Sequence, residues 1–118
     1  MIVTKPANFL EAMVDCLSRG ENLATVHSQE ENDIIQKLAG YKNVWIGLAD
    51  FLDEGKFSWV GDPGNSRFLN WLDGQPDNHA ENEHCAHMMS DGQWNDAPCK
   101  TEFQYVCQQP IFQIIIDK

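Results

Sequence analysis

Apolar residues in the first third of the chain recur with the period of an amphipathic helix. The period is clear over residues 8–19, where Asn8 and Glu11 form a capping pair at the start and Gly20 stops the helix. The predicted inner face consists of Phe9, Ala12, Met13 and Cys16. Because Cys16 lies on that face, we expect it in a disulfide rather than as an exposed reactive thiol.

A second helix is predicted shortly after the first. The segment from Ser28 to Glu31 has the sequence of a capping box, and Gly40 ends the helix. Ile34, Ile35 and Leu38 are predicted to form its inner face. Both predicted helices therefore lie in the first third of the chain.

Beyond the second helix the pattern changes to short strands separated by long turns. The predicted strands cover residues 44–48, 57–60, 85–89 and 104–107. From the turn at 61–65 to Asn82 the chain is rich in turn residues, with Phe68 and Trp71 as predicted anchors to the core. So long an irregular segment in a compact domain usually carries function. Helices followed by strands indicate an α+β fold, and no repeat or linker divides residues 1–118, which we interpret as one domain.

The end of the chain, residues 111–116, is apolar and rich in β-branched residues. It is predicted to add a strand to the sheet beside Ile2 and Val3. The alternative is a dimer contact, because an exposed apolar edge strand readily pairs with another chain.

Composition changes this picture mainly through charge. Of 118 residues, 18 are acidic and 8 are basic, which gives a formal net charge of -10. Such a balance argues against partners such as nucleic acid or anionic membrane surfaces. No apolar run approaches the roughly 20 residues that span a bilayer, so membrane insertion is not expected. The first six residues do not have the pattern of a secretory leader.

The chain has four cysteines: Cys16, Cys85, Cys99 and Cys107. None belongs to a CxxC pair, which disfavours a zinc knuckle or a thioredoxin-like motif. An even number in a small domain favours two disulfides, although four cysteines allow three pairings. Disulfides would place the domain in an oxidising compartment, and we expect a secreted, extracellular protein.

The stretch from Gln75 to Asp96 carries the most distinctive chemistry in the chain. Carboxylates alternate there with neutral amides, and neither Lys nor Arg interrupts them. Carboxylate and amide oxygens are the ligands that calcium prefers, whereas a softer metal would select thiolates and imidazoles. The oxygen donors are Gln75, Asp77, Asn78, Glu81, Glu83, Asn95 and Asp96. We interpret the stretch as a calcium site built on a loop.

Several short motifs, taken together and in order, resemble a known family. They are Trp45-Ile46-Gly47-Leu48, Gln75-Pro76-Asp77, Glu83-His84-Cys85 and Trp94-Asn95-Asp96, together with the four cysteines. Each is weak alone, but the series at this spacing is similar to the C-type lectin-like domain over nearly the whole chain. The resemblance implies two helices, two small antiparallel sheets and a long calcium-binding loop. It also implies a further strand before the first helix, for which only Met1 to Lys5 are at hand here.

The resemblance also implies a disulfide pattern. Cys16 would pair with Cys107 and Cys85 with Cys99. In the chain-entropy model the long first loop contributes about 4–5 kcal/mol of stability and the short second one about 3 kcal/mol. Both values are large compared with the net stability of a small domain.

By the same resemblance, calcium (Ca2+) is the cofactor, and two hydroxyls of a sugar complete its coordination. The implied calcium ligands are Gln75, Asp77, Glu83, Asn95 and Asp96. The implied sugar contacts are Gln75, Asp77, His79, Glu83 and Asn95. An auxiliary calcium site would use Asp50, Glu54 and Asn78, with Glu83 shared. Pro76 would follow a cis peptide bond that turns both neighbouring side chains toward the ion.

In this family Gln-Pro-Asp accompanies galactose and N-acetylgalactosamine, so glycans with terminal galactose or GalNAc are the expected partners. His79 stands where strong galactose binders usually place a Trp, and no glycine-rich segment follows. Mannose or fucose is therefore the alternative. Weak single-site affinity would require a homo-oligomer for useful avidity. The resemblance further implies a role in innate immunity.

Three other functions compete with this interpretation. His79, His84 and His87 crowd around Cys85 and could bind zinc, but a cysteine in a disulfide is no ligand. Paired carboxylates could act in a glycosidase, yet carboxylates held by calcium remain ionised and cannot donate protons, so we do not expect an enzyme. A protein- or ice-binding member of the family would keep the fold without sugar affinity, but such members typically lose calcium ligands.

Overall fold

The structure is a computed structural model, and it describes residues 1–51, 56–60, 68–74 and 84–109. Several predictions fall outside these residues. They are the turn at 61–65, the apolar segment 111–116, Glu54 of the auxiliary site and all the loop ligands from Gln75 to Glu83. The described parts contain both helices and the four strands predicted between residues 44 and 107.

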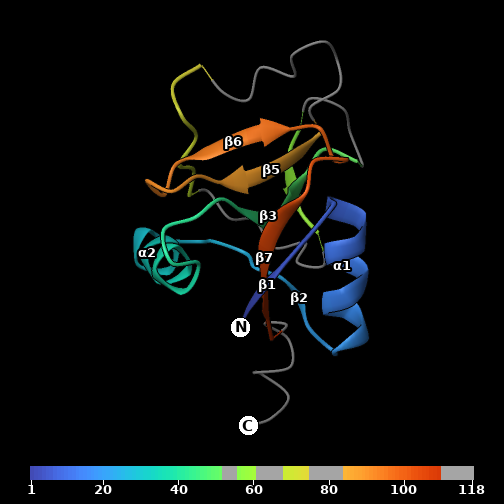
Figure 1. The fold of residues 1–118 in the computed structure, drawn as a ribbon. Helices are drawn as coiled ribbons and strands as arrows, with labels where there is room; N and C mark the ends of the chain where they lie inside the picture. Colours follow the sequence, from blue (N-terminus) through green and yellow to red (C-terminus); the bar gives the residue numbers. More distant parts are fainter. Residues whose placement is uncertain (52–55, 61–67, 75–83, 110–118) are drawn as a thin grey trace, which may run out of the picture.

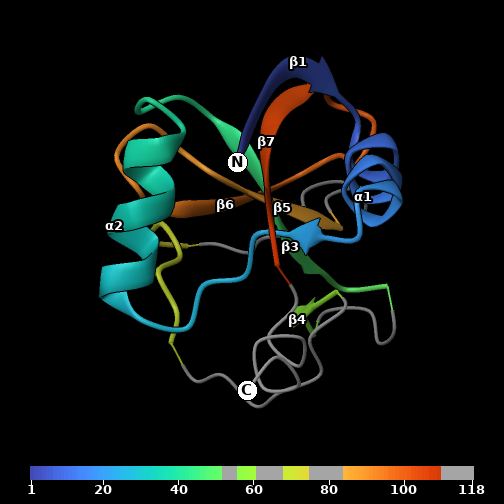
Figure 2. The same cartoon turned by 90° about the horizontal axis from the view of Figure 1, so that it is seen from below.

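Two helices flank a central sheet in the described chain, and Figure 1 shows them on opposite sides of it. The elements are β1 (Ile2–Ala7), α1 (Phe9–Ser18), β2 (Asn22–Leu23), α2 (Gln29–Leu38), β3 (Val44–Ala49), β4 (Ser58–Trp59), β5 (Cys85–Met88), β6 (Trp94–Ala97) and β7 (Phe103–Gln108). Seen from below, α1 and α2 again lie at opposite edges (Figure 2). The predicted α+β class is confirmed.

The strands form one connected sheet in the order β1-β7-β3-β5-β6, with β2 beside β7 and β4 beside β3. We expected two small antiparallel sheets, but they are joined into one. The joint is a parallel pairing of β3 with β7, in which Val44 and Trp45 lie opposite Gln104 and Tyr105. The strand that the resemblance implies before α1 is present as β1, paired with β7. One further difference is that the segment around Trp94 is itself a strand, β6, paired with β5.

Helix α1 forms as predicted. The Asn8 side chain accepts a hydrogen bond from Glu11 N at 2.8 Å, and the Glu11 carboxylate accepts one from Asn8 N at 3.0 Å. At the other end Gly20 has φ +74, and Glu21 N donates to Cys16 O across the last turn. The buried face is Phe9, Ala12 and Cys16. The glycine can adopt the left-handed backbone that closes a helix in this way.

Helix α2 corrects two predictions. Its buried positions are Asn32 and Ile35, followed by Ala39 after the last turn, whereas Ile34 is 58% and Leu38 47% exposed. The predicted apolar face was therefore wrong in two of its three members. The physical reason is that the buried Asn32 amide makes two hydrogen bonds. These bonds orient the helix so that Asn32, rather than Ile34 and Leu38, faces the core.

The capping box of α2 is also only half formed. The Ser28 hydroxyl accepts a hydrogen bond from Glu31 N at 3.1 Å, as the motif predicts. The Glu31 carboxylate, however, accepts from His27 N at 2.9 Å rather than from Ser28 N. The carboxylate therefore caps the residue that precedes the helix start, which still satisfies one otherwise unpaired backbone donor.

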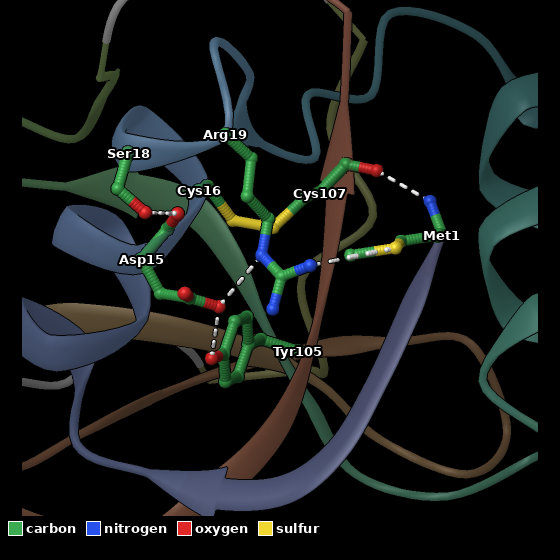
Figure 3. Close-up of a disulfide and its surroundings, with 7 residues drawn as sticks. All are labelled: Met1, Asp15, Cys16, Ser18, Arg19, Tyr105 and Cys107. Atoms are coloured by element: carbon green, nitrogen blue, oxygen red, sulfur yellow. Dashed lines mark hydrogen bonds and ion pairs between the residues drawn. A yellow bond between two sulfur atoms is a disulfide. The ribbon is translucent and has the colours of Figure 1, made fainter.

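Both expected disulfides are present. Cys16–Cys107 ties α1 to β7 across 91 residues, and Cys85–Cys99 joins the start of β5 to the turn after β6 across 14 residues. Figure 3 shows polar groups gathered around the first of these disulfides: the Tyr105 hydroxyl donates to Asp15 at 2.7 Å, and Arg19 Nε donates to the same carboxylate at 3.1 Å. Helix and strand are thus joined by covalent and polar contacts together.

Trp94 is the centre of an aromatic cluster in the larger part of the core. Its ring lies edge-on to Trp59 at 5.5 Å and to Phe68 and Trp71 at 5.8 Å each, measured between ring centroids. Phe68 and Trp71 are therefore core anchors, as predicted. Edge-to-face contacts at such distances favour one arrangement of the rings, so the start of β6 is rigidly positioned.

Gly47 lies in the middle of the fully buried strand β3, where β2 passes close by. A Cβ at this position would lie 3.1 Å from Leu23 O and 3.3 Å from Ala24 O. Its amide N donates to Ala24 O at 2.8 Å, which draws the two backbones together. The glycine of the Trp45–Leu48 motif is thus explained by close backbone approach.

Candidate functional site

Three residues of the predicted calcium sites lie in the described chain: Asn95 and Asp96 on β6, and Asp50 directly after β3. The others lie outside the described residues: Glu54, Gln75, Asp77, Asn78, His79 and Glu83. The structure therefore describes the part of the predicted sites that lies on β6 and at the end of β3, and we call this part the framework of the site.

Asn95 and Asp96 are placed by the register of β6 against β5. Asn95 pairs with His87 and Asp96 pairs with Ala86. Because successive residues of a strand point to opposite faces, Asn95 shares the face of His87, whereas Asp96 shares the face of Ala86 and Trp94. Asn95 is half-buried, and Asp96 is 0% exposed.

The segment that enters the predicted loop is fastened to the start of β6. Trp94 N donates to Asn70 O, and Leu72 N donates to Trp94 O, both at 2.8 Å. The Asn70 side chain adds a hydrogen bond of 2.7 Å from its Nδ2 to Gly92 O. These bonds hold the chain at Leu72, three residues before Gln75 in the sequence.

The segment that leaves the predicted loop is fastened on the other side of β6. Cys85 pairs with Ala97 across the β5–β6 ladder and is held by its disulfide to Cys99. The residue before it, His84, accepts a backbone hydrogen bond from Asp50 N at 3.1 Å. Leu72, before segment 75–83, and Cys85, after it, are therefore both paired with the strand that carries Asn95.

Asp50 has a contact that the sequence did not reveal. His84 Nδ1 lies 3.0 Å from one carboxylate oxygen of Asp50 and 3.3 Å from the other, and the carboxylate is almost entirely buried. A buried carboxylate requires such compensation. Nothing in the sequence pointed to this partner 34 residues away.

His87 lies next to Asn95 and is buried among aromatic rings. Its ring stacks on Phe103 with centroids 4.4 Å apart and is edge-on to Trp45 at 6.2 Å. Burial lowers the pKa of His87 from 6.5 to about 4, against a smaller opposing effect of a backbone hydrogen bond at Met88. The ring is therefore neutral at physiological pH, and its Nε2 lies 3.5 Å from Asn95 Nδ2.

We asked whether calcium fits this framework. Within the described ranges no three His, Cys, Asp or Glu side chains gather closely enough to hold a metal ion, so a site on β6 requires donors from segment 75–83. The group at hand on the Asn95 face of β6 is an amide, whose oxygen is a ligand of the kind calcium selects, whereas the predicted ligand Asp96 lies on the opposite, buried face. With the Asn95 nitrogen turned toward the neutral His87, the amide oxygen is the atom left for a cation. The donor chemistry therefore fits calcium.

Together, these features define a disulfide-tied α+β domain with one connected sheet. The sequence matches the model of the Lectin C-type domain over residues 5–109. The chain belongs to this family.

Curated relatives support the assignment. The chain is 38% identical over 112 residues to C-type lectin domain family 4 member K from Homo sapiens, covering 89% of this chain and 34% of the relative. It is 35% identical over 102 residues to hepatic lectin from Gallus gallus, covering 86% and 49%, respectively. It is 32% identical over 117 residues to salivary C-type lectin 1 from Aedes albopictus, covering 87% and 76%. The chain thus spans between a third and a half of the length of the first two relatives.

Solved structures show the same fold. The carbohydrate-recognition domain of cow CD23, solved in the presence of a GlcNAc2Man3 oligosaccharide, aligns with a TM-score of 0.84 at 33% identity, covering 90% of this chain and 82% of that one. The herring type II antifreeze protein aligns with a TM-score of 0.84 at 26% identity, covering 94% and 89%. The same fold therefore occurs in a carbohydrate-recognition domain and in an antifreeze protein.

No helix in the described part of the chain has the length and apolar character needed to cross a membrane. The three curated relatives reported above are all named as lectins.

Proposed function

We propose that this domain binds carbohydrate in a calcium-dependent manner and that it is not an enzyme. The observation that carries the proposal is that Leu72 and Cys85, on either side of segment 75–83, are both paired with β6, the strand that carries Asn95. The segment itself contains Gln75, Asp77 and Glu83. We infer that the donors of this segment approach Asn95 from between the two anchors.

In the proposed site the side chains divide their polar atoms between the cation and the sugar. Asn95 offers its amide oxygen to the cation while its nitrogen faces His87. The carboxylates of Asp77 and Glu83 each have one oxygen for the metal and a second for a sugar hydroxyl, and Gln75 can donate an N–H to another hydroxyl. Calcium, when bound, would supply coordination positions for two vicinal hydroxyls.

The proposed sugars are galactose and N-acetylgalactosamine, because Gln75 and Asp77 place the amide before the acid. Mannose- or fucose-type sugars are the alternative, since His79 offers less apolar area than a Trp for stacking on a sugar face. Single-site affinity is expected near the millimolar range, about -4 kcal/mol. Several sites on one particle would therefore be needed for firm attachment.

A glycan array run with calcium and with a chelator tests the proposal. Binding to galactose-type glycans should vanish in chelator and return with calcium, and Asn95→Ala and Asp77→Ala should abolish it with the melting temperature preserved. Gln29→Ala, an exposed amide at the start of α2, is the matched control and should bind normally. Binding that persists in chelator would refute the metal-bridged mechanism.

Acid should weaken the same binding, because protons compete with calcium for carboxylates. Isothermal titration with galactose in calcium at neutral and mildly acidic pH measures this. Equal affinity at both values would count against carboxylate ligands.

The second candidate is a ligand-binding role without sugar or calcium. This candidate is supported by the similarity to the herring antifreeze protein. A second solved structure, of a calcium-independent type II antifreeze protein, aligns with a TM-score of 0.81 at 27% identity. Melting curves separate the candidates, since a calcium-dependent rise in the melting temperature is expected only for the lectin. We further propose secretion, in line with the two disulfides, and a homo-oligomer.

A further inference from the structure

The outer surface of α2 carries an apolar stripe that the core does not use. Ile34 and Leu38 lie one turn apart on the helix, and Tyr41 follows three residues later. All three are exposed, at 58%, 47% and 58%. The buried face of the same helix is formed by Asn32 and Ile35, so the stripe points away from the sheet.

Tyr41 adopts a backbone conformation that is costly for its residue type. Its φ is +60, directly after Gly40 at +66, and its N donates to Gln36 O at 3.1 Å in the turn that closes the helix. Bulky residues rarely adopt positive φ, and such strain tends to persist where a side chain has a function. Here the strain holds an aromatic ring exposed, at the end of the stripe.

Charges on one flank of the stripe are arranged for self-association. Glu30 and Lys37 are both exposed and lie seven residues apart, close to two helical turns, so they occupy the same flank. Ile34 lies midway between them. A two-fold axis through Ile34 would set two α2 helices antiparallel and bring each Glu30 beside Lys37 of the second copy.

We propose that this stripe is a homodimer interface in which two α2 helices pack antiparallel around Ile34. The occupant is a second copy because the surface is complementary to itself: acidic in its first half, basic in its second, and apolar between. Isologous contacts of this kind close on themselves and form each charge pair twice.

The dimer would leave both candidate sugar sites accessible. The interface uses the outer face of α2, whereas the inner face contacts Trp94 at the start of β6 through Asn32. Figures 1 and 2 show α2 at the periphery, at the opposite edge from α1. This inference does not depend on the proposed sugar binding, because it rests on a different surface.

Sedimentation equilibrium over about 1 μM to about 1 mM tests the proposal in the range of weak association. The wild-type chain should show a monomer–dimer equilibrium, and the double variant Ile34→Gln/Leu38→Gln should weaken it at least about tenfold. Leu10→Gln/Leu17→Gln removes equally exposed apolar side chains from α1 and is the matched control, with an unchanged dimer constant expected.

Charge exchange tests the antiparallel arrangement. Glu30→Lys and Lys37→Glu should each weaken the dimer by about three- to tenfold, and the double exchange should restore it, because both changes act twice in a symmetric pair. Tyr41→Gly should weaken the dimer while the melting temperature of the monomer stays level or rises, since glycine relieves the positive φ.

Three results would overturn the proposal. They are a monomer throughout the concentration range, a dimer that survives the α2 variants but not the α1 variants, and a double charge exchange that fails to restore association. Melting curves of every variant separate loss of the interface from loss of the fold.

Discussion

Asn32 provides the sharpest test of how the framework of the site is held. Its side chain accepts a hydrogen bond from Trp94 Nε1 at 2.8 Å and donates one to Gly92 O at 3.0 Å, in a position only 1% exposed. Asn32→Ala removes both bonds and leaves the indole N–H buried without its acceptor. We therefore expect a large loss of stability from a single polar substitution.

The magnitude follows from the two contacts. A buried donor left unsatisfied costs about 1–3 kcal/mol. Gly92 O keeps its second hydrogen bond, from Asn70 Nδ2, so the loss there is about 0.5–1.5 kcal/mol. The sum is about 1.5–4.5 kcal/mol, which at roughly 4 °C per kcal/mol lowers the melting temperature by about 6–18 °C.

Urea unfolding followed by tryptophan fluorescence measures the effect. Gln36→Ala is the matched control on the same helix, because its Nε2 donates to Ser90 O at 2.9 Å in an exposed setting. The control should lose only about 0.5 kcal/mol. A loss below about 1 kcal/mol for Asn32→Ala, or one no larger than that of the control, would refute the reasoning.

Three other predictions concern stability. Gly47→Ala should cost about 1–3 kcal/mol by chemical denaturation, because the added methyl meets the backbone of β2. Replacing Cys85 and Cys99 together by Ala should cost about 3 kcal/mol and lower the melting temperature, which equal curves for variant and wild type would contradict. Burial, aided by the hydrogen bond to Asp15, raises the pKa of Tyr105 to about 12. Since the unfolded tyrosine titrates near 10, this group's contribution to stability is complete below pH 10 and is lost as the pH rises through 12; Tyr105→Phe should flatten that part of the stability curve.

Local signals in the sequence predicted α1 well. Its cap, its stop and its inner face depend on contacts within a few residues, so spacing alone determines them. The disulfides came from the family resemblance, because four cysteines allow three pairings and spacing does not choose among them.

Helix α2 shows where local reasoning fails. Counting apolar residues favoured Ile34 and Leu38 over Asn32, because an amide is usually exposed. The amide is buried because its partners, Gly92 and Trp94, come from a turn and a strand some 60 residues away. The signal was present in the spacing of Asn32, Ile35 and Ala39, but only the tertiary contact gives it meaning.

The types of metal ligand in the candidate site can be predicted from the sequence, but the contacts that hold these residues in place cannot. The donor types of Asn95 and Asp96 can be read from the sequence, whereas their placement on opposite faces of β6 depends on strand register. The contact of His84 with Asp50 and the burial of His87 arise from neighbours far along the chain. Long-range pairs of this kind are set by the fold, and pattern analysis does not reach them.

The two fixed points that bracket segment 75–83 have an evolutionary consequence. Gly74 follows Asn70 and Leu72, which are hydrogen-bonded to the backbone of Trp94, and His84 precedes Cys85, which is held by its disulfide. A different sequence could therefore replace residues 75–83 between the same two anchors. If this segment carries the ligand contacts, as proposed, ligand preference can diverge by exchange of a short segment without renewed selection on the core. A relative's segment grafted between these points should melt like its host while recognising what the donor recognises.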